Sequence, residues 1–255
     1  MSLEIYQFAC LQDNYGYLIR DQASGDVAAI DTPEVDAINN ALAEKGWSLT
    51  HIFNTHHHFD HAGGNLALKE QWNCTIVGPK AEAARIPGID IAVGEGDEVR
   101  LGETLAHIHD TPGHTLGHIV FHFAGEGVAF VGDTLFALGC GRLFEGTAEQ
   151  MWQSLLKLKN WPESTTLYCA HEYTQANARF ALSVDPDNEA LKKRCIQIDE
   201  LRADGKPTVP SSLDVELATN PFLRADQPAL KLSLGMDGAG DVDVFAQVRT
   251  RKDNF

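Results

Sequence analysis

Hydrophobic and polar positions follow two different periods along the chain. Between residues 3 and 171, short runs rich in β-branched residues recur, which is typical of strands, and other stretches carry apolar residues at helical spacing. The expected strands are Tyr17–Arg20, Val27–Ile30, His51–Asn54, Thr75–Val77, Leu105–His109, His118–Phe123, Val128–Val131 and Thr166–Cys169. The expected helices are Val35–Lys45, Ala62–Gln71 and Ala148–Lys159, the last with Thr147 as its N-cap.

The pattern changes after Glu172, where the strand signal ceases. Gln175–Val184 and Asn188–Ala203 carry helical periodicity, residues 205–221 predict a proline-bearing loop, and helical spacing resumes at Val242. We therefore expect an α/β layered domain followed by a small helical domain. The expected domains are residues 1–172 and 173–255.

Composition and charge narrow the classes of partner. The chain has 255 residues, 44% of them hydrophobic, which is ordinary for a folded protein. Its 20 basic and 36 acidic residues give a net charge of -16, which opposes general attraction to phosphate backbones or anionic lipid. We therefore expect no nucleic-acid or membrane partner, and an anionic substrate would need a local basic cluster.

The cysteines and the N-terminal residues bear on location. Five scattered cysteines without a C-x-x-C pair predict reduced thiols rather than disulfides or a thiolate metal site. The first residues, up to Tyr17, lack a basic start followed by an apolar run, and no stretch approaches the roughly 18 apolar residues of a membrane span. We expect a cytoplasmic protein that acts as a monomer.

A histidine-rich segment is the strongest chemical signal. His56–His61 holds four of the chain's 11 histidines together with Asp60. Imidazole and carboxylate are ligands that suit zinc, iron or manganese. In an extended chain His56 and His58 point to the same side, because the period is two, and His57 faces elsewhere. Asp60 and His61 stand where the chain turns into a helix, and they can face a second metal.

Three further segments complete the set of candidate ligands. His114, Asp133 and His171 each follow a strand-like run, and loops at strand ends are where α/β folds place reactive groups. A single histidine is more often structural than a metal ligand. Because these segments occur together with the histidine-rich segment, we interpret their residues as ligands. His118 is expected at most to support a ligand by contact, without binding metal itself. The histidines inside strand patterns are assigned no role; they are His51, His107, His109 and His122.

These residues resemble the metallo-β-lactamase superfamily. Its T-H-x-H-x-D-H motif stands here at Thr55–His61, and an aspartate closing an early strand stands at Asp31. The resemblance implies an α/β fold, an αββα sandwich, with two metal sites. By this likeness His56, His58 and His114 bind one metal, Asp60, His61 and His171 bind the other, and Asp133 is shared.

Within that superfamily the whole chain resembles glyoxalase II, the hydroxyacylglutathione hydrolase family. The motifs that carry this likeness are Asp13–Tyr15, Gly139–Arg142, His171–Thr174, Asn220–Arg224 and Arg249–Phe255. The family has a helical domain that helps to hold glutathione. The substrate contacts that the resemblance implies are Arg142, Phe144, Tyr173, Arg249 and Lys252. Many members have Lys-x-Tyr where this chain has Arg142-Leu143-Phe144, which keeps the positive charge and removes a phenol hydroxyl.

The resemblance implies hydrolysis of S-(2-hydroxyacyl)glutathione, such as S-D-lactoylglutathione, to glutathione and a 2-hydroxy acid, as in methylglyoxal detoxification. Two divalent metal ions would hold a hydroxide nucleophile, and zinc is expected in preference to iron or manganese. Asp60 and Asp133 are the carboxylates expected to take part in catalysis. Asp31 is expected to organise the histidine segment from behind.

Other interpretations stay open at this point. A persulfide dioxygenase of the same fold would use a single iron and lack the helical domain, and a nuclease would show a basic surface. A lactonase is a further alternative. A non-catalytic metal-binding module would need both sites to be saturated by protein ligands, which a shared carboxylate and mixed ligands argue against. The basic residues after Val248 could also be an ordinary solvated end of the chain.

Overall fold

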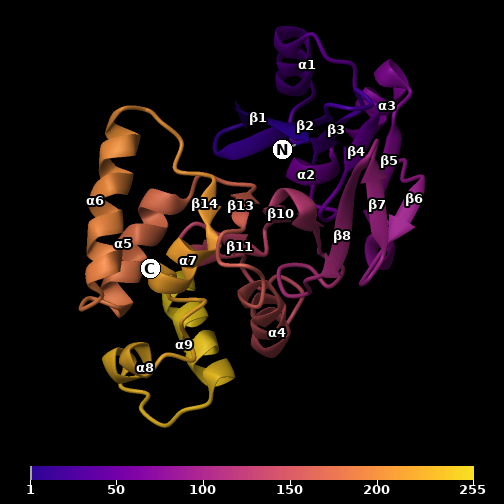
Figure 1. Cartoon of the computed structure of the whole chain (residues 1–255). Helices are drawn as coiled ribbons and strands as arrows, with labels where there is room; N and C mark the ends of the chain where they lie inside the picture. Colours follow the sequence, from indigo (N-terminus) through magenta and orange to yellow (C-terminus); the bar gives the residue numbers. More distant parts are fainter. Residues whose placement is uncertain (1) are drawn as a thin grey trace. The chain divides into compact units, whose positions relative to one another are not determined.

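The computed structural model describes residues 2–255, which form two compact units (Figure 1). Unit 1 comprises the residues up to Asp110 together with Leu116–Gly132, and unit 2 comprises Thr111–Thr115 and Asp133–Phe255. The expected α/β architecture with a helical C-terminal region is confirmed. The functional boundary expected at residue 172 stays a prediction. Among the described residues, no helix combines the length and the apolar character needed to cross a membrane.

A six-stranded mixed sheet forms the first half of unit 1. Its order is β1-β2-β3-β4-β5-β6, antiparallel from β1 to β3 and parallel from β3 to β6. All four residues of β3 are buried, as expected for a strand with both faces covered. The strands are β1 (Leu3–Cys10), β2 (Asn14–Asp21), β3 (Val27–Ile30), β4 (His51–Phe53), β5 (Thr75–Pro79) and β6 (Ile91–Val93).

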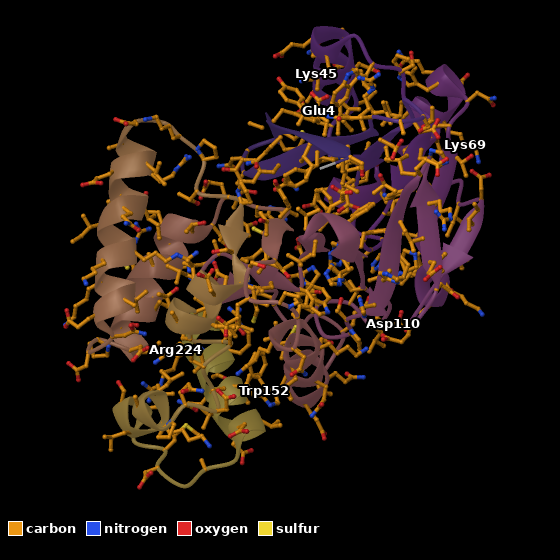
Figure 2. The ribbon with its side chains drawn as sticks, in the orientation of Figure 1. Glu4, Lys45, Lys69, Asp110, Trp152 and Arg224 are labelled. Atoms are coloured by element: carbon orange, nitrogen blue, oxygen red, sulfur yellow. The ribbon has the colours of Figure 1, made fainter. Side chains whose placement is uncertain are left out.

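Helices cover one face of this sheet. They are α1 (Val35–Lys45), α2 (Phe59–Ala62), α3 (Asn65–Trp72) and the 3-10 helix η1 (Lys80–Glu82). Ile38 and Leu42 of α1 pack with Ile52 in the core beneath it, and Lys45 forms a 2.8 Å ion pair with Glu4 (Figure 2). The helix expected over Ala62–Gln71 is divided in two at Gly63 and Gly64. A Cβ on Gly64 would lie 2.9 Å from the Thr32 carbonyl oxygen, so the chain needs glycine for this close approach.

A second, antiparallel run of strands faces the first sheet within unit 1. Its order is β10-β9-β8-β7. The ring of Phe53 stacks on Phe121 at 5.1 Å, and Tyr17 meets Phe130 at 5.4 Å, so side chains from the two inner faces form one core. The strands are β7 (Glu98–Leu101), β8 (Thr104–Asp110), β9 (Ile119–Phe123) and β10 (Val128–Gly132), with the 3-10 helix η2 (Ala124–Glu126) between the last two.

Unit 2 is mainly helical. It begins with the hairpin β11 (Leu135–Phe136) and β12 (Gly139–Cys140), and β13 (Thr166–Cys169) pairs with β14 (Ser211–Ser212). The Thr147 cap of α4 is confirmed, since Thr147 and Gln150 form a reciprocal capping box. Trp152 of α4 contacts Phe245 of α9 at 6.0 Å. The helices are α4 (Ala148–Lys159), α5 (Thr174–Val184), α6 (Glu189–Ala203), α7 (Leu213–Thr219), α8 (Pro228–Leu234) and α9 (Asp241–Asp253).

One prediction about the C-terminal region is wrong. Residues 205–221 are not a loop without structure, because β14 and α7 lie there. The buried Glu216 holds α7 in place by accepting hydrogen bonds from the Leu138 backbone at 3.0 Å and from the Arg194 guanidinium. A seven-residue helix is shorter than the 10–12 residues over which helical periodicity becomes readable.

Candidate metal centre

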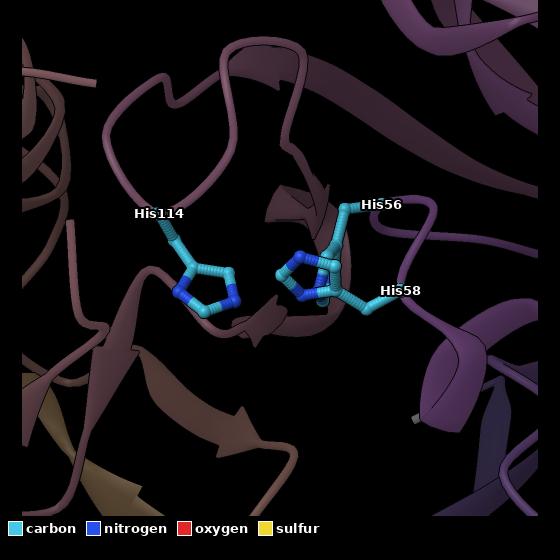
Figure 3. Close-up of side chains that lie close together, drawn as sticks. All are labelled: His56, His58 and His114. Carbon is cyan, nitrogen blue, oxygen red and sulfur yellow. The ribbon is translucent and has the colours of Figure 1, made fainter. Parts of the chain in front are cut away.

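The histidine loop, Thr55–His58, connects β4 to α2. His56 Nε2 lies 3.0 Å from His58 Nδ1, so these two side chains point to the same side, as the period of two predicts (Figure 3). His57 points to Glu82 instead, and its Nδ1 lies 2.8 Å from that carboxylate. The loop therefore presents two imidazole nitrogens together at the exit of a buried strand.

Asp31 lies behind this loop, directly after β3. Its carboxylate accepts hydrogen bonds from the Thr55 backbone and the Thr55 hydroxyl, both at 2.8 Å, and lies 2.8 Å from His61 Nδ1. Asp31 has φ 59°, a left-handed conformation that is uncommon for a residue other than glycine and is found often at functional sites. These contacts agree with the expectation that Asp31 organises the histidine segment.

The same contacts determine which nitrogen of each imidazole can bind a metal. Because the Asp31 carboxylate only accepts, His61 carries its hydrogen on Nδ1 and its lone pair on Nε2. The Thr55 hydroxyl donates to Asp31, so it accepts from His56 Nδ1 at 3.0 Å. Both histidines therefore have Nε2 available as a ligand atom, which is the usual arrangement of a metal-binding histidine.

In unit 2, Asp133 contacts two histidines through different oxygens. Its Oδ2 lies 3.3 Å from His114 Nε2, and its Oδ1 lies 3.4 Å from His171 Nε2. His114 Nδ1 is 2.9 Å from the Arg142 carbonyl oxygen, which fixes the hydrogen on Nδ1 and leaves the lone pair on Nε2. Asp133 comes directly after β10, and all three side chains are buried. A carboxylate arranged in this way can serve as a shared ligand.

Candidate ligand atoms gather in three groups, and within each group they all lie within 4.8 Å of one another. Figure 3 shows the first group. The groups are His56, His58 and His114; His56, His61 and Asp133; and Asp60, His61 and His171. Every metal ligand predicted from the sequence belongs to at least one of these groups.

The donors in these groups fit a transition metal. They are imidazoles and carboxylates, which suit zinc, iron and manganese alike. Thiolates are not part of the set, since burial raises the pKa of Cys140 to about 11 and that of Cys169 to about 12 and keeps both as thiols.

Three of the predicted substrate residues lie beside candidate ligands of unit 2. Phe144 is exposed, and its ring centroid lies 5.2 Å from that of His114. The Tyr173 ring stacks on His171 at 4.7 Å with an interplanar angle of 2°. The Arg142 side chain is exposed, and its Nε lies 3.8 Å from Asp253.

The other two predicted substrate residues lie on one face of α9. Arg249 is buried and donates to the Cys140 carbonyl at 2.9 Å and to Asp253 at 2.8 Å. Lys252 Nζ lies 5.4 Å from the Phe180 ring centroid. Burial lowers the pKa of Lys252, and the charges of Arg249, Arg142 and Arg179 lower it further. These cations therefore form a basic cluster, in which Arg249 is already hydrogen-bonded to Cys140 and Asp253.

Two residues that contact the segments of the candidate ligands were assigned no role in the sequence analysis. Asn14 donates to the Asp60 carboxylate at 3.1 Å, and Glu82 binds His57. Asn14 stands in one of the motifs that carry the family resemblance, so a signal for it was present. Glu82 stands in a stretch with no predicted element, and nothing in the sequence singles it out.

Comparison with known proteins agrees with this geometry. The fold and the ligand groups define a metal-binding protein of the metallo-β-lactamase superfamily, whose family pattern matches residues 17–171. Residues 172–255 match the family described as Hydroxyacylglutathione hydrolase C-terminus. The crystal structure of ETHE1 from Myxococcus xanthus superposes with a TM-score of 0.70 at 26% identity, covering 97% of this chain and 90% of that one.

Curated relatives match the chain over its whole length. The hydroxyacylglutathione hydrolase of Maricaulis maris (strain MCS10) is 54% identical over 253 residues, covering 99% of each chain. That of Chelativorans sp. (strain BNC1) is 55% identical over 255 residues and 100% of each chain. The chain therefore belongs to the hydroxyacylglutathione hydrolase family and is a hydrolase. The other enzymes of this fold and the non-catalytic module are not favoured.

Proposed function

We propose that this chain hydrolyses S-(2-hydroxyacyl)glutathione thioesters, such as S-D-lactoylglutathione, at a centre of two divalent metal ions. The observation that carries the proposal is Asp133, whose two oxygens lie 3.3 Å and 3.4 Å from His114 and His171. Full-length similarity to enzymes that bear the hydrolase name supports the substrate class. In this role the chain would act in methylglyoxal detoxification.

The proposed ligands divide into two sets with one shared member. His56, His58 and His114 would hold the first ion, Asp60, His61 and His171 would hold the second, and Asp133 would belong to both sets. Two bound divalent ions supply Lewis acidity, which polarises a carbonyl and makes water acidic near neutral pH. We propose zinc as the metal, although the same donors also suit iron and manganese.

The chain's own residues hold the ligands in the correct orientation. Asp31 and Thr55 fix the imidazoles of His61 and His56, and Asn14 holds the Asp60 carboxylate at 3.1 Å. A positioned acid is not needed for the leaving group, because a cysteine thiol has a pKa of about 8.5 and leaves readily as the thiolate.

The basic cluster of unit 2 is proposed to select glutathione, which carries two carboxylates. Arg142 and Lys252 supply positive charge, and Phe144 and Tyr173 supply aromatic surface next to His114 and His171. Arg249 adds its charge while its hydrogen bonds hold Cys140 and Asp253. Charge-assisted hydrogen bonds of this kind recognise carboxylates effectively.

We also propose that the protein acts in the cytoplasm as a monomer. The cysteines found among the described residues are all free and buried, which fits a reducing compartment.

A panel of substrates tests the proposed reaction. The purified chain should hydrolyse S-D-lactoylglutathione with a kcat/KM at least roughly 100-fold above that for β-lactams, lactones and phosphodiesters, a preference that pocket contacts of a few kcal/mol provide. Consumption of oxygen with glutathione persulfide is the measurement for the dioxygenase alternative. A higher kcat/KM for any of these compounds than for the glutathione thioester would overturn the proposal.

A further inference from the structure

A buried carboxylate, Glu82, lies against the side of the histidine loop that faces away from the ligand atoms. Only 3% of Glu82 is exposed. Its Oε2 accepts a hydrogen bond from the His57 backbone N–H at 2.8 Å and lies 2.8 Å from His57 Nδ1. One carboxylate oxygen therefore holds both the backbone and the side chain of the residue between His56 and His58.

The second oxygen of Glu82 holds another segment that contacts His56. Glu82 Oε1 accepts from the Gly117 backbone at 3.0 Å. The next residue, His118, stacks its ring on His56 at 4.8 Å, and the Ile119 backbone donates to the Thr55 carbonyl at 2.9 Å. Glu82 thus connects the histidine loop to the segment that packs on its first histidine.

The position of Glu82 is itself fixed. It ends η1, and its own carbonyl accepts hydrogen bonds from the backbones of Arg85 and Ile86 at 2.7 and 3.2 Å. The Arg85 guanidinium also contacts His57 Nε2. A Cβ on Gly117 would lie 2.5 Å from Glu82 Cγ, so the carboxylate can approach only because this residue is glycine.

We propose that Glu82 is a positioning residue for metal binding: by fixing His57, it sets the directions of His56 and His58. The inference rests on the proposed function, since it assigns Glu82 a role toward the ion that these two histidines hold. Neighbouring residues in an extended segment point to opposite sides, so a restraint on His57 from behind restrains both ligands at once. Losing such an outer contact typically lowers metal affinity by roughly 10–100-fold.

Cobalt titration of the metal-stripped full chain tests the proposal. Glu82→Ala should bind one of two Co²⁺ ions roughly 10–100-fold more weakly in competition with a chelator and should show an altered visible spectrum. Glu82→Gln keeps one carbonyl oxygen, so its loss should be smaller. Gly117→Ala, which displaces Glu82 without changing the carboxylate, should reproduce the effect of Glu82→Ala.

Asp21→Asn is the matched control. Asp21 is also a buried carboxylate of unit 1, and it accepts backbone hydrogen bonds from Ala23 and Ser24 in a turn outside the ligand segments. This variant should lose stability without a change in Co²⁺ affinity or spectrum. Wild-type affinity and spectrum in folded Glu82→Gln and Gly117→Ala would overturn the proposal, even if Glu82→Ala fails to fold. A wild-type chain that binds no metal would instead overturn the proposed function.

Discussion

At the scale of single residues, the sequence singled out candidate ligands that lie together in the structure, and their role as ligands stays a prediction. Of the residues that contact these segments, Asn14 and Glu82 were assigned no role. His56, His58 and His61 stand within one short motif whose residue types identify its chemistry. Asp31 could be identified because it directly follows a strand that the sequence predicts. Glu82 could not, because its contact with His57, 25 positions away, depends on a turn that leaves no periodic signal.

Asp133 and His57 should differ sharply when each is replaced by alanine. Asp133→Ala removes the partner of both His114 and His171, so the chain should lose bound metal, and turnover should fall by more than the roughly 100-fold that outer contacts can cost. His57→Ala keeps the backbone hydrogen bond to Glu82, so both quantities should change much less. Elemental analysis and kcat/KM measure the contrast. Loss of metal from His57→Ala alone would show that the ligand assignment is wrong.

At the scale of elements, local signals decided which parts of the fold could be predicted. The bounds of β3, α1, α4 and β13 match the sequence prediction, because each carries a periodic pattern or a capping residue. The eight-residue β1 was missed because polar residues interrupt its apolar pattern, and the short helices α7 and α8 depend on contacts with distant segments. The buried Glu216 of α7, bonded to Leu138, is one such contact.

The last turn of α9 should select glutathione. Lys252→Ala should lower kcat/KM for a glutathione thioester, relative to a small thioester without the peptide, by roughly tenfold or more, since a charge-assisted contact contributes about 1.5–3 kcal/mol. Arg251→Ala is the matched control because it removes the same charge from an exposed neighbour that contacts Leu234. If the ratio of the two kcat/KM values is the same in both variants, the end of the chain contributes only general positive charge, and Lys252 makes no specific contact with glutathione.

The β8–β9 pair should make the stability of the fold sensitive to acid. Burial, together with repulsion from His109 and His107, lowers the pKa of His122 from 6.5 to about 4. Between these pH values the unfolded chain binds a proton that the folded chain does not. The free energy of unfolding should therefore fall as the pH decreases from about 6.5 to 4, by up to about 3 kcal/mol.

Urea unfolding of the metal-stripped chain at pH 7 and pH 4.5 measures this effect without the pH dependence of metal binding, and comparison with His122→Gln separates His122 from the other histidines. His122→Gln should lose much less stability between the two pH values than the wild-type chain does. His107→Gln, which changes the half-exposed partner opposite His122 on β8, should keep most of the loss. If His122→Gln and the wild type lose the same stability in acid, the acid sensitivity arises from groups other than His122.

At the scale of the whole chain, a net charge of -16 must be reconciled with the anionic substrate that we propose. At physiological ionic strength the Debye length is about 8 Å, so acidic residues farther away are largely screened. Arg142, Arg179 and Arg249 are near enough to Lys252 to lower its pKa, so they act together as a local positive field. We therefore expect the charge near the proposed substrate site, rather than the total charge, to decide binding.

The holoprotein should contain close to two transition-metal ions per chain, because Asp133 contacts His114 and His171 through separate oxygens. Removing the ions with a chelator should abolish turnover and lower Tm, and adding zinc should restore both. An ion present at 1,000 times its Kd stabilises the folded chain by about 4.1 kcal/mol. In a protein of this size, losing it corresponds to a decrease in Tm of roughly 8–16 °C. Elemental analysis with paired calorimetry of the stripped and reloaded chain measures both quantities. A fully active preparation with one equivalent of metal would contradict the binuclear centre and leave Asp133 as an ordinary ligand of a single ion.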